Sequence, residues 1–176
     1  GLDIILRNDA AHAADNVIAA LKDKDIKYRN TALLAAPSII GDGVFDAVAS
    51  KFKSLSPAAK IDVINWLGNN HVVSQTDLVV ENISSQDMPL AIAAVNAASK
   101  IGGDKSLAAL TSALGDDNEL SAAAQAALLS FNGNINSGIL EALDSSDSNV
   151  AAKALRLASA RHIYDAYPKT VNLIAN

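Results

Sequence analysis

Few residues in this 176-residue chain have the types and spacing that catalysis requires. The three histidines, His12, His71 and His162, lie far apart, and none has a second histidine or an acid at a metal-ligand spacing such as HExxH. The chain has no GxSxG elbow to activate a serine. It also has no cysteine, which removes thiolate zinc sites and cysteine nucleophiles. These features predict a protein that is not an enzyme and that uses no cofactor.

Two glycine-containing segments superficially resemble nucleotide-binding loops. The segment 102–106 reads GGDKS, but Asp104 interrupts the Gly-Lys-Ser run and no strand comes before it. The segment 41–43 reads GDG and has no third glycine at the required place. We interpret both segments as turns between helices.

Acidic turns are the strongest candidates for an ion site. The segments 116–119 and 144–147 read DDNE and DSSD. Calcium needs six or more oxygen ligands, and neither segment has the spacing of a calcium loop. Asp, Asn and Ser also cap the N-termini of helices. We therefore expect helix caps here rather than a metal site.

Asp15, Asp46 and Asp77 recur every 31 residues. A ladder of carboxylates along one edge of the molecule could recognise basic groups. A carboxylate in the first turn of a helix is also worth about 0.3–1 kcal/mol through the helix dipole. The repeat favours this second, structural interpretation.

An apolar residue recurs about every thirty residues, each time at the end of a similar stretch of sequence. This period predicts where the helices lie. Its positions are Leu21, Phe52, Ile83, Leu114 and Leu143. A fixed period near thirty residues indicates one supersecondary unit stacked many times. We predict alanine-rich first helices over 26–40, 57–68, 89–101, 120–131 and 149–163. We predict second helices over 13–23, 44–54, 74–84, 105–114 and 136–144, and essentially no sheet.

Several residues mark the expected ends of these helices. Ser56 before a proline has the composition of an N-cap. Pro37 should kink or break the first long helix, because it removes a backbone donor and clashes with the preceding turn. Glycines that follow apolar runs are expected to be left-handed C-caps, and these are Gly41, Gly68, Gly102 and Gly133.

The units resemble HEAT repeats, in particular the short bacterial variety of roughly thirty residues that also occurs in phycobilin lyases. The segment 89–102, PLAIAAVNAASKIG, carries the resemblance best, and 57–64 and 149–156 are similar. The resemblance implies an all-α protein, a right-handed α-α superhelix (solenoid) of about five helical hairpin repeats. We expect residues 1–176 to form a single domain. Because the chain starts with Gly1 and 167–176 look like an unfinished helix, we expect this domain to be excised from a longer protein.

Charge is unevenly distributed along the chain. Residues 62–147 contain eleven acidic and two basic side chains, whereas 148–176 contain one acidic and four basic ones. The acidic middle disfavours binding to nucleic acid. It could attract a basic partner, or it could be a solvated surface that keeps the protein soluble. No apolar run approaches the length of a membrane span, and a chain without cysteine suits both the cytoplasm and an exported location.

These features favour a non-catalytic protein-interaction or scaffold module of a larger bacterial protein. We expect the second helices to offer a concave face to a protein partner or to a neighbouring domain of the same polypeptide. The candidate contact residues are Gln75, Glu81, Asn82, Thr111, Ser112 and Glu141, with Arg156 and Arg161 in the basic last unit. The alternatives are an accessory helical domain attached to a catalytic domain outside this chain, for example a carbohydrate-active one, a lyase-like HEAT enzyme, or a structural spacer.

Overall fold

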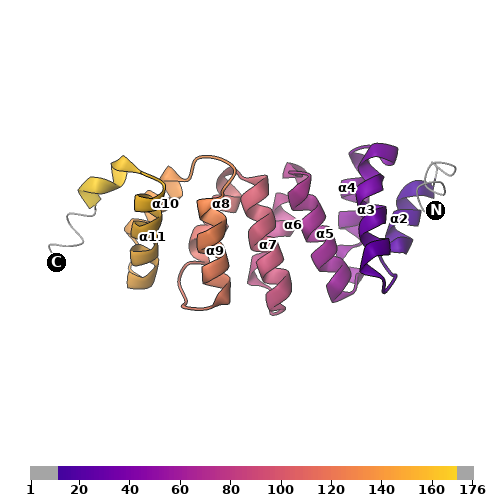
Figure 1. The fold of residues 1–176 in the computed structure, drawn as a ribbon, viewed down its shortest axis with the longest axis horizontal. Coiled ribbons are helices and arrows are strands. Elements are labelled where there is room, and N and C mark those ends of the chain that lie inside the picture. The colour runs from indigo at the N-terminus through magenta and orange to yellow at the C-terminus, as the bar shows by residue number, and fades with distance from the viewer. Residues whose placement is uncertain (1–11, 170–176) are drawn as a thin grey trace.

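All regular elements of the computed structural model, which describes residues 12–169, are helices, and this range contains no strand. Figure 1 shows the helices side by side in one elongated array. The N-terminal α2 lies at one end of the array and α11 at the other. Of the stretch that was expected to form an unfinished helix, residues 170–176 lie outside the described range.

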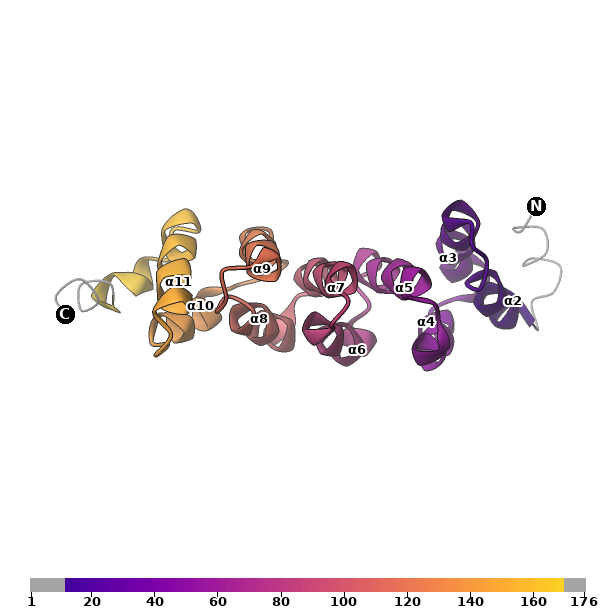
Figure 2. The same ribbon diagram turned by 90° about the horizontal axis from the view of Figure 1, so that it is seen from below.

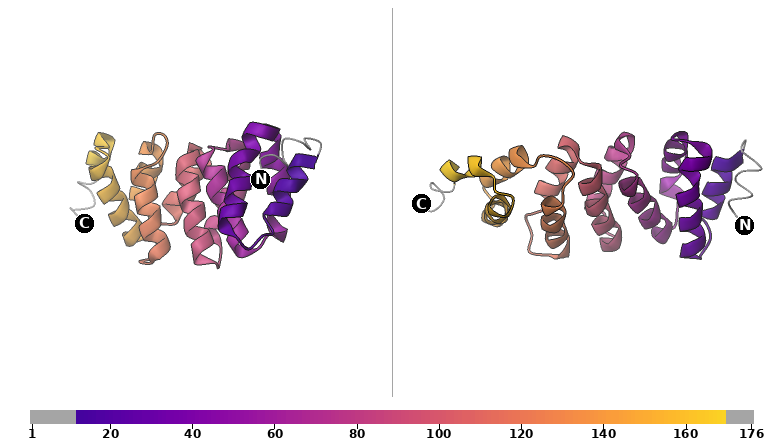
Figure 3. Two further views of the ribbon diagram at one scale, coloured as in Figure 1. Left: turned by 45° about the vertical axis from the view of Figure 1, so that its right-hand side comes forward. Right: turned by 45° about the horizontal axis from the view of Figure 1, so that its top comes forward.

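The helices form two rows. The first row contains the longer helices α3 (Ile26–Ile40), α5 (Pro57–Asn69), α7 (Met88–Ile101), α9 (Glu119–Leu129) and α11 (Ser148–Ala160). The second row contains α2 (Ala13–Ala20), α4 (Gly43–Ser50), α6 (Thr76–Glu81), α8 (Gly103–Ser112) and α10 (Asn136–Leu143). Short 3-10 turns extend the second row at η2 (Phe52–Ser54), η3 (Val73–Gln75) and η4 (Asn82–Ser84), and η5 (Tyr164–Ala166) follows α11. Figure 2 shows the two rows end-on, and the turned views of Figure 3 keep the same helices as neighbours. The predicted ranges agree with these helices to within about four residues at each end.

Side-chain caps begin the first-row helices, as predicted. Ser56 accepts from the Ala59 N–H at 3.3 Å, and Asn118 accepts from the Ser121 N–H at 2.9 Å. The other first-row N-caps are Asp25, Asp87 and Asp147. The acidic turns therefore satisfy backbone N–H groups that have no partner within the helix.

Only some of the expected glycine C-caps are confirmed. Gly41 and Gly102 end α3 and α7 with φ of 82° and 77°, and Gly133 has φ of 136° in the turn after α9. The prediction for Gly68 is wrong, because this residue is buried inside α5. A Cβ atom on Gly68 would lie 2.6 Å from the Cα atom of Ala97, so the glycine lets α5 and α7 approach closely.

Histidines occupy the left-handed positions where α5 and α11 end. The φ angles of His71 and His162 are 52° and 54°. After α5, the Val72 N–H donates to the Leu67 carbonyl and the His71 N–H donates to the Gly68 carbonyl, each at 3.1 Å. This pair of bonds defines a Schellman motif, and the same pattern follows α11.

Pro37 does not break the first long helix. The helix α3 continues through Pro37 to Ile40, and the Gly41 N–H donates to the Pro37 carbonyl at 2.9 Å. Because Pro37 lies in the last turn, only one intrahelical donor is lost before the helix ends. The prediction of a break is therefore wrong.

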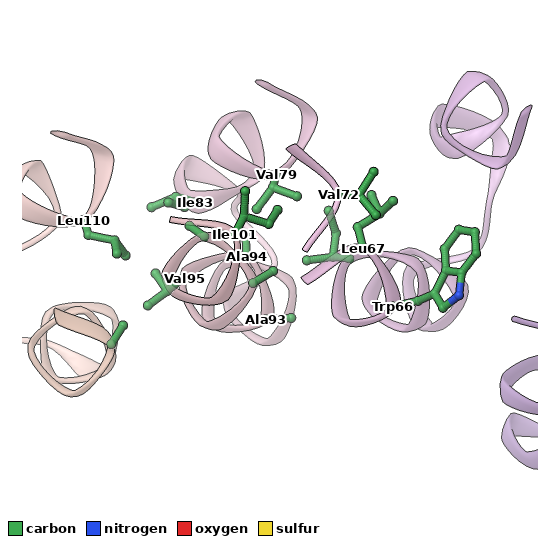
Figure 4. Packing of buried hydrophobic residues seen from close by; sticks show 14 of the residues in the cluster. Trp66, Leu67, Val72, Val79, Ile83, Ala93, Ala94, Val95, Ile101 and Leu110 are labelled. Carbon is green, nitrogen blue, oxygen red and sulfur yellow. The ribbon is translucent and has the colours of Figure 1, made fainter. Parts of the chain in front are cut away.

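The hydrophobic core lies between the two rows along the whole array. The five recurring apolar residues are all buried: Leu21, Phe52, Ile83, Leu114 and Leu143. Figure 4 shows how Leu67 of α5, Val79 of α6 and Ala94 of α7 meet near the middle of the array. Apolar side chains from both rows, among them many alanines, thus form one continuous core. None of the described helices has both the length and the apolar composition needed to cross a membrane.

Candidate functional site

The six candidate contact residues predicted from the middle of the sequence all lie in the second row. Gln75 ends η3, and Glu81 and Asn82 lie where α6 passes into η4. Thr111 and Ser112 end α8, and Glu141 lies in α10. All six side chains are exposed or half-buried. They therefore share one side of the array without converging on one pocket.

Three of these side chains bond to their own helix. Asn82 donates through Nδ2 to the Leu78 carbonyl at 2.8 Å. The Thr111 hydroxyl donates within α8, at 3.1 Å from the Leu107 carbonyl, and the Ser112 hydroxyl donates to the Ala108 carbonyl at 2.9 Å. Such local bonds are ordinary for these residue types in helices. They leave these side chains less free to bind another molecule.

The carboxylates that recur every 31 residues have structural roles. Asp15, Asp46 and Asp77 lie in the first turns of α2, α4 and α6, where the helix dipole favours negative charge. Asp46 also accepts a hydrogen bond from Gln75 Nε2 at 2.6 Å, and Asp77 pairs with Lys105 Nζ at 2.7 Å. Each of these contacts joins a hairpin to the next one.

Exposed carboxylates without partners remain in the second row from α6 to α10. Glu81, Asp104 and Glu141 are exposed, and among residues 12–169 they have no ion-pair or hydrogen-bond partner. We call these three residues the second-row carboxylates. The two basic residues of the acidic segment do not compensate them, because Lys105 pairs with Asp77 and Lys100 lies in the first-row helix α7, where it donates to Asn69 Oδ1 at 2.7 Å. The second row is therefore negatively charged from α6 to α10.

In the basic last unit, Lys153 is buried and surrounded by oxygen atoms. Its Nζ lies 3.0 Å from the Leu114 carbonyl, 2.8 Å from the Asp116 carbonyl and 3.0 Å from the Ser121 hydroxyl. Its fourth partner is the exposed carboxylate of Asp117, at 3.1 Å. We call these four oxygen atoms the lysine cage. The acidic turn 116–119, which was considered as a calcium site, thus binds the ammonium group of Lys153.

Arg161 and Lys169 also bind the preceding unit. Arg161 donates to the Leu129 carbonyl at 2.8 Å and to the Gly133 carbonyl at 3.4 Å. Lys169 donates to the Leu140 carbonyl at 3.0 Å and forms an ion pair with Asp144. Two arginines were predicted to contact a partner. One of them, Arg161, instead links its own unit to the preceding unit. Arg156 is exposed and has no such partner within the described range.

Sequence reasoning missed a buried ion pair between α3 and α5. Arg29 Nε lies 2.6 Å from Asp62 Oδ2, and the two side chains are 4% and 7% exposed. Arg29 Nη1 also donates to two carbonyls of the turn before α3, each at 3.0 Å. One sequence signal was available, because Asp62 stands at a position where the next two repeats have alanine. These alanines, Ala93 in α7 and Ala124 in α9, are both buried.

The described residues do not bring histidines and acids together as metal ligands. In residues 12–169, no group of three or more His, Cys, Asp or Glu side chains is placed to hold a metal ion. His71 Nδ1 lies 2.6 Å from the Lys100 carbonyl, and because a carbonyl only accepts, Nδ1 must carry the proton. His162 lines a pocket of about 360 Å³ at α11 and η5, whose other walls include Leu155, Ile163 and Tyr164.

No protein-family model matches the chain, and no curated protein sequence matches it either.

Proposed function

We propose that this chain is a non-catalytic protein-interaction or scaffold module, built as a right-handed α-α superhelix of about five helical hairpins and similar to HEAT repeats. The paired helices in two rows and the continuous core between the rows support this architecture. Stacked arrays of this kind offer long surfaces for binding another protein. The partner is a separate protein or a neighbouring domain of the same polypeptide.

The observation that carries the proposal is the uncompensated charge of the second row. The second-row carboxylates, Glu81, Asp104 and Glu141, come from α6, α8 and α10. Figure 2 shows that these three helices follow one another along the row. The binding surface is the second row, and the partner presents basic side chains to it.

Charge of this kind acts mainly on recognition and on the rate of association. Opposite charge on the partner raises the association rate and rejects acidic competitors. Exposed charges are screened beyond about 8 Å at physiological ionic strength. Binding should therefore weaken steeply as salt is added.

Site-specific photo-crosslinking in cells of the source organism tests the proposal. A benzophenone amino acid replaces Ser112, which is exposed on α8, and in the matched control it replaces Asn96, which is exposed on the first-row helix α7. We expect one discrete crosslinked protein at Ser112 and none at Asn96. Combining Glu81→Gln with Glu141→Gln should reduce that product strongly. Equal products at both positions, or a product that the charge changes leave intact, would refute the proposal.

A further inference from the structure

The turns that lead into the first-row helices share one edge of the array, which we call the capping edge. Each turn follows one of the five recurring apolar residues and ends on the N-cap of the next first-row helix. Figure 1 shows these turns along the lower side of the array. They span residues 22–25, 53–56, 84–87, 115–118 and 144–147. The edge is therefore a row of equivalent positions whose side chains can be compared turn by turn.

The first two turns of the capping edge are basic. Six lysines lie in these turns or at the adjacent helix ends: Lys22, Lys24, Lys27, Lys51, Lys53 and Lys60. Only two aspartates, Asp23 and Asp25, accompany the six lysines, so the net charge is +4. Both aspartates accept backbone N–H groups at 2.8 Å. Among residues 12–169, none of the six lysines has an ion-pair partner.

The last two turns of the capping edge are acidic. Five carboxylates lie in them or at the adjacent helix starts: Asp116, Asp117, Glu119, Asp144 and Asp147. Lys153 pairs with Asp117 and Lys169 pairs with Asp144, so two of the five are compensated and a net charge of −3 remains. The side chains of Asp116 and Glu119 are exposed, and within residues 12–169 neither carboxylate has an ion-pair partner.

The middle turn, 84–87, separates the two charged halves. Its one charged residue is Asp87, which accepts from the Leu90 N–H as the N-cap of α7. The next two residues, Met88 and Pro89, are apolar, and Pro89 is exposed. From the N-terminal to the C-terminal end, the five turns are therefore basic, basic, nearly neutral, acidic and acidic.

The two charged halves are too far apart to neutralise each other within one molecule. The second and fourth turns are two helix spacings apart, which is about 16–20 Å for packed helices. Exposed charges are screened beyond about 8 Å at physiological ionic strength. Each half of the capping edge thus keeps its charge for contact with another molecule.

We propose that two copies of this chain associate through their capping edges in antiparallel orientation. A two-fold axis through the middle turns places the basic half of each copy against the acidic half of the other. The second turn then faces the fourth, the first faces the fifth, and every contact occurs twice. Pro89 of each copy lies near the axis, where an apolar contact takes the place of charge.

The order of the charges is what favours a second copy as the partner. Reversing the direction of the edge exchanges its basic and acidic halves, so the edge is complementary to itself. A parallel pair of edges would oppose like charges and repel. A uniformly anionic partner, such as a membrane surface, would be repelled by the acidic half of the same edge. This contact does not use the second-row carboxylates and so goes beyond the proposed function.

Analytical ultracentrifugation of the full chain tests the association. At about 0.1 mM protein, dissociation constants of that order are measurable. We expect a monomer–dimer equilibrium in about 0.1 M salt and monomers in about 1 M salt, where the Debye length falls from about 10 Å to about 3 Å. A chain that is monomeric at both salt concentrations, or a dimer that is equally stable at both, would overturn the proposal.

Two charge-reversal variants identify the contact. One combines Lys51→Glu with Lys53→Glu, and the other combines Asp116→Lys with Glu119→Lys. Each variant alone should self-associate at least about tenfold more weakly than the parent, because like charges then face each other. An equimolar mixture of the two variants should form a dimer with one copy of each, because both contacts regain opposite charges. A mixture that stays monomeric would contradict the antiparallel arrangement.

A matched control changes charge away from the capping edge. Glu81→Gln combined with Glu141→Gln should leave the dissociation constant of the dimer unchanged. A loss of dimer in this control would place the contact on the second row instead and overturn the proposal. Far-UV circular dichroism checks that each variant is folded. If Glu119→Lys unfolds α9, whose first turn favours an acid, Asp116→Lys alone replaces that pair.

Vesicles that contain phosphatidylserine test the other use of the six lysines. We expect no cosedimentation of the parent chain with these vesicles in about 0.1 M salt, because the acidic half of the edge opposes it. A parent chain that stays monomeric but cosediments, and that loses this binding on Lys51→Glu with Lys53→Glu, would assign the lysines to a membrane surface and overturn the proposal.

Discussion

Two lysines of this chain show how burial decides what a charged side chain contributes. Lys153 and Lys105 both form an ion pair with an aspartate. The side chain of Lys153 is 7% exposed and that of Lys105 is 69% exposed. Only Lys153 also donates to carbonyls of a neighbouring unit, the buried one of Leu114 and the partly buried one of Asp116. The lysine cage therefore holds two units together, whereas the exposed pair adds little.

We expect Lys153→Met to lower the free energy of unfolding by about 1–3 kcal/mol, because it removes the hydrogen bonds of a buried ammonium group while it keeps the apolar stem. Lys105→Met, the matched control, should cost less than about 1 kcal/mol. Urea denaturation of both variants measures the difference. Equal losses would show that the cage contributes no more than a surface ion pair.

At this scale, local contacts were predictable and distant ones were not. The helix caps, such as Asn118, depend on neighbours two or three residues away, and so the sequence pattern indicated them. The partners of Lys153 and Arg161 are mainly main-chain carbonyls of another unit, and a carbonyl has no sequence signature. Arg161 was consequently predicted as a free contact residue although it binds Leu129 and Gly133.

Glycines set the distance between helices as well as ending them. Gly68 lies within α5 against Ala97 of α7, and Gly138 of α10 lies against the side chain of Leu107 in α8. Gly43, at the start of α4, has no atom of another residue within 4 Å of the position of a Cβ. The same residue type thus allows a close helix contact in one element and has no steric role in another.

Gly68→Ala should destabilise the protein by about 1–3 kcal/mol, because the new methyl group overlaps the backbone of Ala97 and forces the two helices apart. Gly43→Ala should be neutral or stabilising by up to about 1 kcal/mol, because alanine is the better helix former. Thermal or urea unfolding distinguishes the two signs. A loss of stability in both variants would mean that Gly43 has a contact role as well.

The helices themselves were predictable because their limits depend on local signals. Apolar periodicity and N-caps placed each helix to within about four residues. The prediction for Gly68 was wrong because a glycine that follows an apolar run has the same local sequence whether it ends its helix or packs against a neighbouring helix. Only the packing of α7 on α5 decides between these roles. Pro37 is tolerated because it lies only one turn from the end of α3.

At the scale of the molecule, neighbouring units supply almost all contacts. The central helix α7 packs against α5, α6, α8 and α9, whereas α11 packs mainly against α9, α10 and η5. The thirty-residue period predicted this serial arrangement. It could not anticipate the contacts of residues that depart from the repeat, such as Trp66, which packs against Phe45.

Native-state hydrogen exchange should follow the position of each helix in the array. We expect the slowest exchange in α7 and faster exchange in α2 and α11, since end units have a neighbour on one side only among the described helices. Exchange measured by mass spectrometry with peptides from each helix provides the test. Equal protection from α2 to α11 would indicate that the array unfolds in a single cooperative step.

The joints between units have a mechanical consequence. Ser99 donates to the Ala127 carbonyl, Lys100 donates to Asn69, and Arg161 donates to the Leu129 carbonyl, so each joint ties one hairpin to the next. Tension applied to the two ends passes through these joints in series. The weakest joint then yields first and lengthens the chain by one unit while the others hold. A molecule built in this way extends under load in steps, one unit at a time.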